Sequence, residues 1–155
     1  MLLSDILYNV SLKSVSGLTD IDIQKIAFDS RQVEPNTLFV AIAGTQVNGH
    51  LYIDKAIELG ATAILCESLP EKTQENITYL LVENSPKAMG VAASNFYGNP
   101  SKKVILVGVT GTNGKTSIAT LLFNLFRKLG YRCGLLSTVQ NQIEDQIIVS
   151  THTTP

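Results

Sequence analysis

One stretch constrains the fold more than any other part of the chain: Val104-Ile-Leu-Val-Gly-Val-Thr-Gly-Thr-Asn-Gly-Lys-Thr-Ser117. Its apolar, largely β-branched run from Val104 to Val109 predicts a buried strand. A glycine-containing break follows, and Lys115 then begins a pattern with the period of an amphipathic helix. The apolar positions of that helix share one face: Ile118, Leu121, Leu122, Leu125 and Leu129. Gly130 predicts its end. A strand, a glycine loop, Gly-Lys-Thr and a helix in this order favour a phosphate-binding loop.

Such a loop binds phosphate through its backbone. The N–H groups of Gly111, Thr112, Asn113 and Gly114, and those of the helix start, are expected to converge on an anion. Lys115 reaches the outer phosphates, and the Thr116 hydroxyl can hold the magnesium that accompanies a nucleotide triphosphate. The general pattern has a glycine where this chain has Val109. The alternative is an ordinary strand-to-helix turn that happens to contain Gly-Lys-Thr.

Composition describes an ordinary globular protein. The 155 residues are 45% hydrophobic and 16% charged, which suits one domain or one small domain plus part of another. No segment has the roughly 20 apolar residues of a membrane span, and there is no secretory signal pattern. No basic run contains interleaved aromatic residues, which argues against nucleic acid as a partner. We therefore expect a cytoplasmic protein without a membrane partner. We also expect a monomer.

Cysteine and charge add two further expectations. Cys66 and Cys133 each lie in an apolar, strand-like run, which favours reduced, buried thiols. Residues 1–100 contain 6 Lys/Arg and 11 Asp/Glu, a net charge of −5, whereas residues 101–155 contain 6 and 2, a net charge of +4. The positive part suits a phosphate-rich ligand, although solvated surface charge explains the numbers equally well.

The first hundred residues predict a complete set of α/β elements. Helices are expected at 2–10, 52–59 and from Ser85-Pro86 to 96, and strands at 23–28, 38–42, 62–66 and 79–82. Ser85 is the expected N-cap, with Pro86 at the first helical position. Gly98-Asn99-Pro100 ends the last helix and predicts a domain boundary.

The rest of the chain predicts the opening of a second α/β domain. Residues 132–138 are expected to form the next parallel strand, and residues 143–149 an edge hairpin around Glu144-Asp145. Two strands do not complete a nucleotide-binding sheet. The expected organisation is therefore a small α/β domain at 1–100, then the start of a P-loop α/β domain at 101–155. We expect the chain to be a fragment of a longer protein.

Three stretches together resemble the Mur ligase family. The first is Phe28-Asp-Ser-Arg-Gln-Val-Glu-Pro35 with Leu38-Phe-Val-Ala-Ile-Ala-Gly44 and Asn48-Gly-His50, similar to the uridine-binding domain of MurE-type and MurF-type ligases. The second is Val109-Thr-Gly-Thr-Asn-Gly-Lys-Thr116, which resembles the family's ATP loop and accounts for Val109. The third is Thr153-Thr-Pro155, similar to a MurE-type segment that contacts the muramoyl-dipeptide. The resemblance favours the MurE type.

This resemblance implies an ATP-dependent ligase of peptidoglycan synthesis. It would add the third amino acid, diaminopimelate or lysine, to UDP-MurNAc-L-Ala-D-Glu through an acyl phosphate, with ATP and Mg²⁺ as cofactors. Lys115 would neutralise the transferring phosphoryl group, Thr116 would bind magnesium, and the loop from Gly111 to Ser117 would bind ATP. The expected substrate-binding residues are Ser30, Arg31, Thr45, Gln46, Val47, Thr153 and Thr154.

The family's modified lysine, its adenine-binding residues and its C-terminal amino-acid domain would lie downstream. The chain alone is therefore expected to be inactive. The alternatives are a MurF-type ligase that adds D-Ala-D-Ala, a P-loop kinase or GTPase-like switch, and a non-catalytic P-loop nucleotide-binding module.

Simpler interpretations exist for several residues. Ser30 suits a turn after a strand, and Arg31 suits a surface ion pair. Asp29 is expected to brace its loop through backbone hydrogen bonds. His50 is expected to be a structural residue at a helix entry rather than a catalyst, because no carboxylate or nucleophile near it in sequence suggests a triad.

Overall fold

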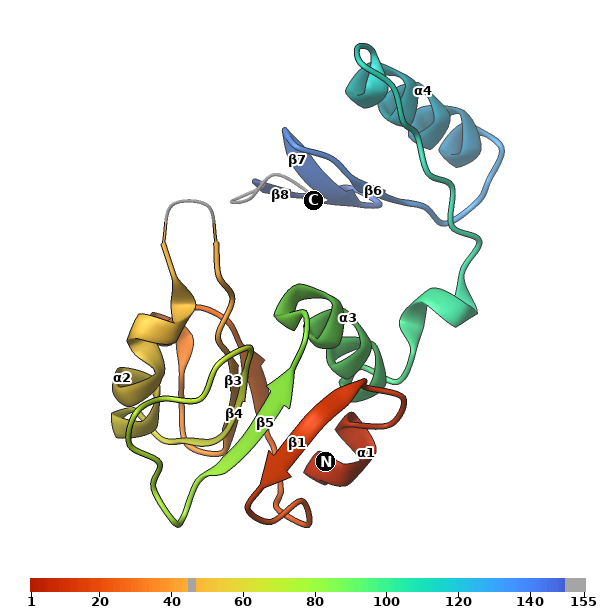
Figure 1. Ribbon diagram of the computed structural model, residues 1–155. Coiled ribbons are helices and arrows are strands. Elements are labelled where there is room, and N and C mark those ends of the chain that lie inside the picture. The colour runs from red at the N-terminus through yellow and green to blue at the C-terminus, as the bar shows by residue number, and fades with distance from the viewer. Residues whose placement is uncertain (45–46, 150–155) are drawn as a thin grey trace. The chain divides into compact units, whose positions relative to one another are not determined.

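The computed structural model describes residues 1–44 and 47–149 (Figure 1). Its contacts divide the chain into two compact units, Met1–Ile105 and Leu106–Pro155. The expected α/β class is confirmed. The assignment of residues 1–100 and 101–155 to two functional domains stays a prediction.

The first unit contains a five-stranded sheet in the order β1-β5-β4-β3-β2. Its strands are β1 (Leu12–Ser16), β2 (Lys25–Ala27), β3 (Thr37–Val40), β4 (Ala61–Cys66) and β5 (Thr78–Val82). The pairs β2–β3, β3–β4 and β4–β5 are parallel, and β1 is an antiparallel edge strand. The four strands predicted in this region are therefore present, and β1 is an addition.

Helices cover both faces of this sheet. They are α1 (Leu3–Ile6), α2 (Ile53–Glu58) and α3 (Ser85–Phe96), with 3-10 turns η1 (Ser30–Gln32), η2 (Gly49–Tyr52) and η3 (Pro100–Lys103). Figure 1 shows α2 on one side of the sheet and α1 with α3 on the other. The first helix is shorter than predicted. The last begins one residue earlier than predicted, because Asn84 rather than Ser85 is its N-cap.

Alternating side chains divide the core into two layers. In β3, Leu38 and Val40 pack with α1 and α3, whereas Phe39 packs with α2. All four residues of β3 are buried. A parallel strand covered on both faces requires such continuous apolar burial, and this is why the strand pattern was readable in the sequence.

The second unit contains one helix and an antiparallel sheet. Its elements are α4 (Lys115–Lys128), β6 (Gly134–Leu136), β7 (Gln140–Ile143) and β8 (Gln146–Val149), with sheet order β6-β7-β8. The predicted hairpin around Glu144-Asp145 is confirmed, and Glu144 has φ +52° in its turn.

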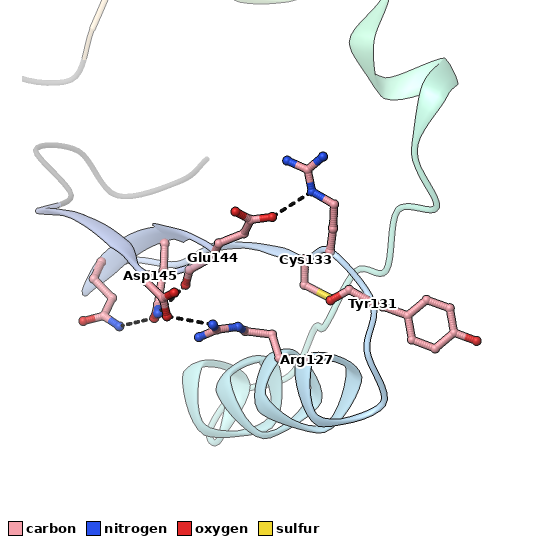
Figure 2. Close-up of polar contacts among 8 residues, drawn as sticks. Arg127, Tyr131, Cys133, Glu144 and Asp145 are labelled. Carbon is pink, nitrogen blue, oxygen red and sulfur yellow. Dashed lines mark hydrogen bonds and ion pairs between the residues drawn. The ribbon is translucent and has the colours of Figure 1, made fainter.

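Two ion pairs connect the second unit's helix and its following segment to the hairpin turn (Figure 2). Arg127 Nη2 lies 2.7 Å from Asp145 Oδ1, and Arg132 Nε lies 2.7 Å from Glu144 Oε1. The Arg127 guanidinium also lies 5.6 Å from the ring centre of the buried Phe123. These contacts orient the hairpin against the C-terminal turn of α4.

Two strand predictions are wrong. Residues 104–109 form no strand, and Ile105 is 95% exposed. The expected parallel strand at 132–138 is the short β6, which pairs antiparallel with β7. The reason is the same in both cases, because a parallel strand needs a parallel neighbour and no described residue of this unit supplies one.

Gly60 offers a test of the first unit's packing. It has φ +106°, and a Cβ there would lie 2.9 Å from Pro35 Cα. We expect Gly60→Ala to lower the free energy of unfolding by about 2 kcal/mol through strain and overlap. Urea unfolding followed by circular dichroism measures it.

The matched control is Gly90→Ala. Gly90 lies inside α3, and its Cβ position has no heavy atom within 4 Å. Alanine is the better helix former, so stability should rise by up to about 1 kcal/mol. Equal destabilisation by both substitutions would contradict the packing argument.

Candidate functional site

Polar residues follow the strands at one edge of the first unit's sheet. Because β2 to β5 run parallel, their carboxyl ends lie at the same edge. The segments that leave this edge are the η1 turn, the loop 42–49, Glu67, and the start of α3 at Ser85. In open α/β sheets, ligands bind at this edge. The predicted Ser30, Arg31 and Val47 belong to it.

The η1 turn is braced by Asp29, as expected. Asp29 Oδ1 accepts the Arg31 backbone N–H at 3.0 Å. The same carboxylate accepts the Arg31 side chain, at 2.7 Å from Nη2 to Oδ2 and 3.0 Å from Nε to Oδ1. This hydrogen bonding to Asp29 raises the pKa of the Arg31 guanidinium. Arg31 therefore forms a surface ion pair, the simpler of its two predicted roles. Its side chain is nevertheless 82% exposed to solvent.

The loop after β3 closes on its own base. The Gly44 N–H donates to Val47 O at 3.0 Å, and the Gly49 N–H donates to Ile42 O at 2.7 Å. A Cβ on Gly49 would lie 2.7 Å from Ile42 N, so a larger residue could not approach the strand end this closely. Val47 is exposed on this loop. The predicted substrate residues Thr45 and Gln46 lie outside the described residues.

The contact between Glu67 and Ser85 was not predicted from the sequence. Glu67 Oε1 accepts the Ser85 backbone N–H at 2.7 Å and its hydroxyl at 3.0 Å. The bond from the Ser85 N–H is the main reason that the pKa of the Glu67 carboxyl is lowered. The sequence offered one indication of this contact, which is the position of the two residues along the chain. Glu67 directly follows one predicted strand, and Ser85 begins the helix that comes after the next predicted strand.

This carboxylate closes the N-terminus of α3. The Lys87 N–H donates to Asn84 Oδ1 at 2.8 Å, the Ala88 N–H donates to Asn84 O at 3.0 Å, and Pro86 has no N–H. With the Ser85 N–H bonded to Glu67, every donor of the first turn has a partner within the chain. An external anion therefore finds no free backbone donor at this helix start.

The N-terminus of α4 differs from that of α3, because its first backbone N–H groups are not bonded to other described parts of the chain. Within residues 1–44 and 47–149, the backbone N–H groups from Gly111 to Ser117 have no hydrogen-bond acceptor. Gly111 and Gly114 have φ of +152° and +78°, conformations that suit glycine. Free donors on a glycine loop before a 14-residue helix match an anion site.

Lys115 lies across this loop. Its Nζ donates to Gly111 O at 2.5 Å and to Thr112 O at 3.3 Å. The carbonyl of Thr116 accepts the Thr120 hydroxyl at 2.8 Å. Separately, the Thr116 hydroxyl has no hydrogen bond among the described residues. An ammonium, free N–H groups and a hydroxyl fit a nucleotide phosphate with its magnesium.

The remaining predictions have mixed outcomes. Thr153 and Thr154 lie outside the described residues. Both cysteines are free, but only Cys66 is buried, where burial raises its pKa to about 11. No described residues form a group of three or more metal-ligating His, Cys, Asp or Glu side chains. Within the described ranges, no helix is both long and apolar enough to cross a membrane.

These features define the class of the protein. It is an α/β protein with a polar sheet edge in one unit and a glycine loop before a helix in the other. The family model described as "Mur ligase family, catalytic domain" matches residues 22–97, and "Mur ligase middle domain" matches residues 109–155. Together they cover most of the chain. The chain belongs to the Mur ligase family.

Curated relatives align with the whole chain. It is 56% identical over 155 residues to a Bacteroides fragilis protein and 54% identical over 156 residues to one from Cytophaga hutchinsonii. Both are named "UDP-N-acetylmuramoyl-L-alanyl-D-glutamate--2,6-diaminopimelate ligase". The chain covers 32% of each, so it spans about a third of the length of these relatives.

Solved structures share the fold. A 2,6-diaminopimelate ligase structure aligns with 100% of the chain and 31% of its own, with a TM-score of 0.69 and 21% identity. The MurF ligase of Thermotoga maritima, solved in complex with ADP, aligns with 68% of the chain and 23% of its own. Its TM-score is 0.50 and its identity 30%.

The Glu67–Ser85 contact predicts a measurable pKa. We expect Ser85→Ala to raise the pKa of Glu67 only partly, because the backbone N–H, the larger cause, remains. Carbon-detected NMR titration of the Glu67 carboxyl measures it. An unchanged pKa in Ser85→Ala, or an ordinary one in the wild type, would contradict the contact.

The lowered pKa of Glu67 determines how the contribution of its carboxylate to folding stability changes with pH. The ionised carboxylate stabilises the fold above its unfolded pKa of about 4.3, and this contribution is lost as pH falls through the lower folded value. The stability difference between wild type and Glu67→Gln should therefore be largest at neutral pH and shrink in acid. Urea unfolding at several pH values checks this.

Proposed function

We propose that this chain supplies the nucleotide-sugar domain and the ATP loop of a MurE-type ligase. The observation that carries the proposal is the open, lysine-bearing loop before α4, joined in one chain to a polar sheet edge. The names of relatives 50% or more identical over the whole chain support the same activity. The reaction joins an amino acid, diaminopimelate in those names, to UDP-MurNAc-L-Ala-D-Glu.

The first unit is proposed to bind the uridine diphosphate. Ser30 and Arg31 on the η1 turn and Val47 on the β3 loop lie at the sheet edge where ligands of α/β proteins bind. The exposed Arg31 offers a fixed positive charge to a phosphate. Thr45 and Gln46 are proposed to complete this group, and Thr153 and Thr154 to contact the sugar-peptide.

The second unit is proposed to hold the ATP phosphates. When bound, ATP supplies the phosphoryl group that activates the substrate carboxylate as an acyl phosphate. The N–H groups from Gly111 to Ser117 would surround the phosphates, and Lys115 would turn from its loop carbonyls toward the negative charge. Thr116 would offer its hydroxyl to Mg²⁺. The amino acid would bind a further domain of a cytoplasmic, monomeric enzyme.

One assay of the complete ligase tests this function. Purified enzyme should release phosphate from ATP with UDP-MurNAc-L-Ala-D-Glu and diaminopimelate present, and omission of either substrate should abolish release. The MurF-type alternative predicts release with the UDP-tripeptide and D-Ala-D-Ala instead. Nucleotide binding without release under either condition would favour the non-catalytic module.

Substitutions of Lys115 and Thr116 in the complete enzyme should lower turnover for different reasons, and only one of them should respond to magnesium. Lys115→Ala removes a charge needed as negative charge develops, which should cost about 3 kcal/mol of transition-state stabilisation. Thr116→Ala removes one magnesium ligand, which water can partly replace. Turnover measured against magnesium concentration should recover partly for Thr116→Ala and not for Lys115→Ala.

Ser117→Ala is the matched control. Ser117 is exposed one position further into α4, and its loss should be milder than either of the others. If magnesium restores Lys115→Ala as readily as Thr116→Ala, the two roles are assigned wrongly.

Arg31 can be tested in this chain by NMR titration with UDP. Arg31→Lys should weaken binding about tenfold, because an ammonium cannot reproduce two parallel hydrogen bonds to phosphate. Gln32→Ala, the adjacent exposed position, should bind like the wild type. Equal affinities for all three proteins would remove Arg31 from the site.

A further inference from the structure

His50 links the loop after β3 to the neighbouring strand. Its Nε2 accepts the Glu67 backbone N–H at 2.9 Å, across 17 positions of sequence. Its Nδ1 lies 2.9 Å from Asn48 Oδ1. That amide oxygen also accepts the His50 backbone N–H at 3.0 Å, which identifies it as the acceptor.

These contacts require one form of the ring. Since Nε2 accepts a hydrogen bond, it carries no proton, and since Asn48 Oδ1 can only accept, Nδ1 must donate. The neutral Nδ1–H tautomer makes both bonds together. The half-buried ring is therefore oriented from both sides.

The residue that His50 contacts is itself held in place. Glu67 directly follows β4, and its carboxylate accepts two hydrogen bonds from Ser85 at the start of α3. On the other side, the Gly49 N–H donates to the carbonyl of Ile42, two residues after the end of β3. The base of the loop 42–49 is thus connected through His50 to β4 and α3.

We propose that His50 is a positioning residue for nucleotide binding: it holds the base of this loop, residues 42–44 and 47–49, in its binding geometry without touching the ligand. The inference rests on the proposed function, in which this loop contacts the uridine nucleotide. Gly44 and Val47, the described residues on either side of Thr45 and Gln46, belong to a loop base that His50 connects to the sheet. A loop base that is held in place before binding lowers the conformational entropy lost when the ligand binds, which raises affinity.

Two substitutions separate the two bonds of the ring. His50→Gln places an amide oxygen near the Nε2 position and keeps an acceptor for the Glu67 N–H. His50→Asn places its amide near the Nδ1 position, so it keeps the contact with Asn48 and loses the tie to β4. We expect the loss of UDP affinity to come from the lost hydrogen bond with the Glu67 N–H, because the Asn48 contact joins residues only two positions apart.

The experiment is an NMR titration of the full chain with UDP, at a temperature where each variant is folded. We expect His50→Asn to weaken UDP binding about tenfold and His50→Gln to stay within about threefold of wild type. Amide exchange at Glu67 should accelerate about tenfold in His50→Asn alone. A structural role without positioning would lower thermal stability and leave affinity unchanged.

A wild-type measurement does not depend on how the variants fold. The nitrogen shifts of the His50 ring report its tautomer, and the proposal requires an unprotonated Nε2. A protonated Nε2, or equal UDP affinities for wild type and a folded His50→Asn, overturns the positioning role alone. Absence of UDP binding by the wild type overturns the proposed nucleotide site and this inference with it.

Discussion

The first unit depends on the burial of four parallel strands from both sides. Each parallel strand presents apolar side chains to both faces, as Leu38 and Phe39 do in β3, so helices must cover both. The connections of a parallel sheet leave from one edge. The residues that follow β2, β3, β4 and β5 therefore meet there, although they are far apart in the sequence. Burial of the strands thus creates the polar edge proposed to bind the nucleotide.

The N-termini of the two longest helices, α3 and α4, differ in whether their backbone N–H groups are free to bind an external anion. The start of α3 is closed by the chain itself, because Glu67 and Asn84 accept its free N–H groups. The start of α4 retains its donors and has Lys115 beside them. A helix N-terminus attracts negative charge in either case. An internal carboxylate satisfies it in the first unit, and an external phosphate is the partner proposed in the second.

The second unit has less internal packing than its pattern predicts. The apolar face of α4 is largely in solvent, with Leu121 68% and Leu129 62% exposed, while Phe123 is buried. The two ion pairs to the hairpin turn, from Arg127 in α4 and Arg132 after it, lie at the surface and are each worth about 1 kcal/mol or less. The apolar pattern calls for a neighbouring layer that no described residue of this unit provides.

The sequence by itself determined the α/β class, the positions of four strands in the first unit, the glycine loop before α4 and the hairpin at Glu144-Asp145. These features are local, because side-chain period, turn residues and caps are written in neighbouring positions. The N-cap at Asn84 differs by one residue from the prediction, within the range where helix ends are hardest to read.

Only the tertiary structure decided which distant groups meet. The pairing of His50 with Glu67 and of Glu67 with Ser85 joins three strand ends, and no local pattern encodes it. The same holds for residues 104–109, whose apolar composition predicted a strand that the described structure lacks. A strand exists only when another backbone accepts and donates its hydrogen bonds, so its formation depends on neighbours that its own sequence does not specify.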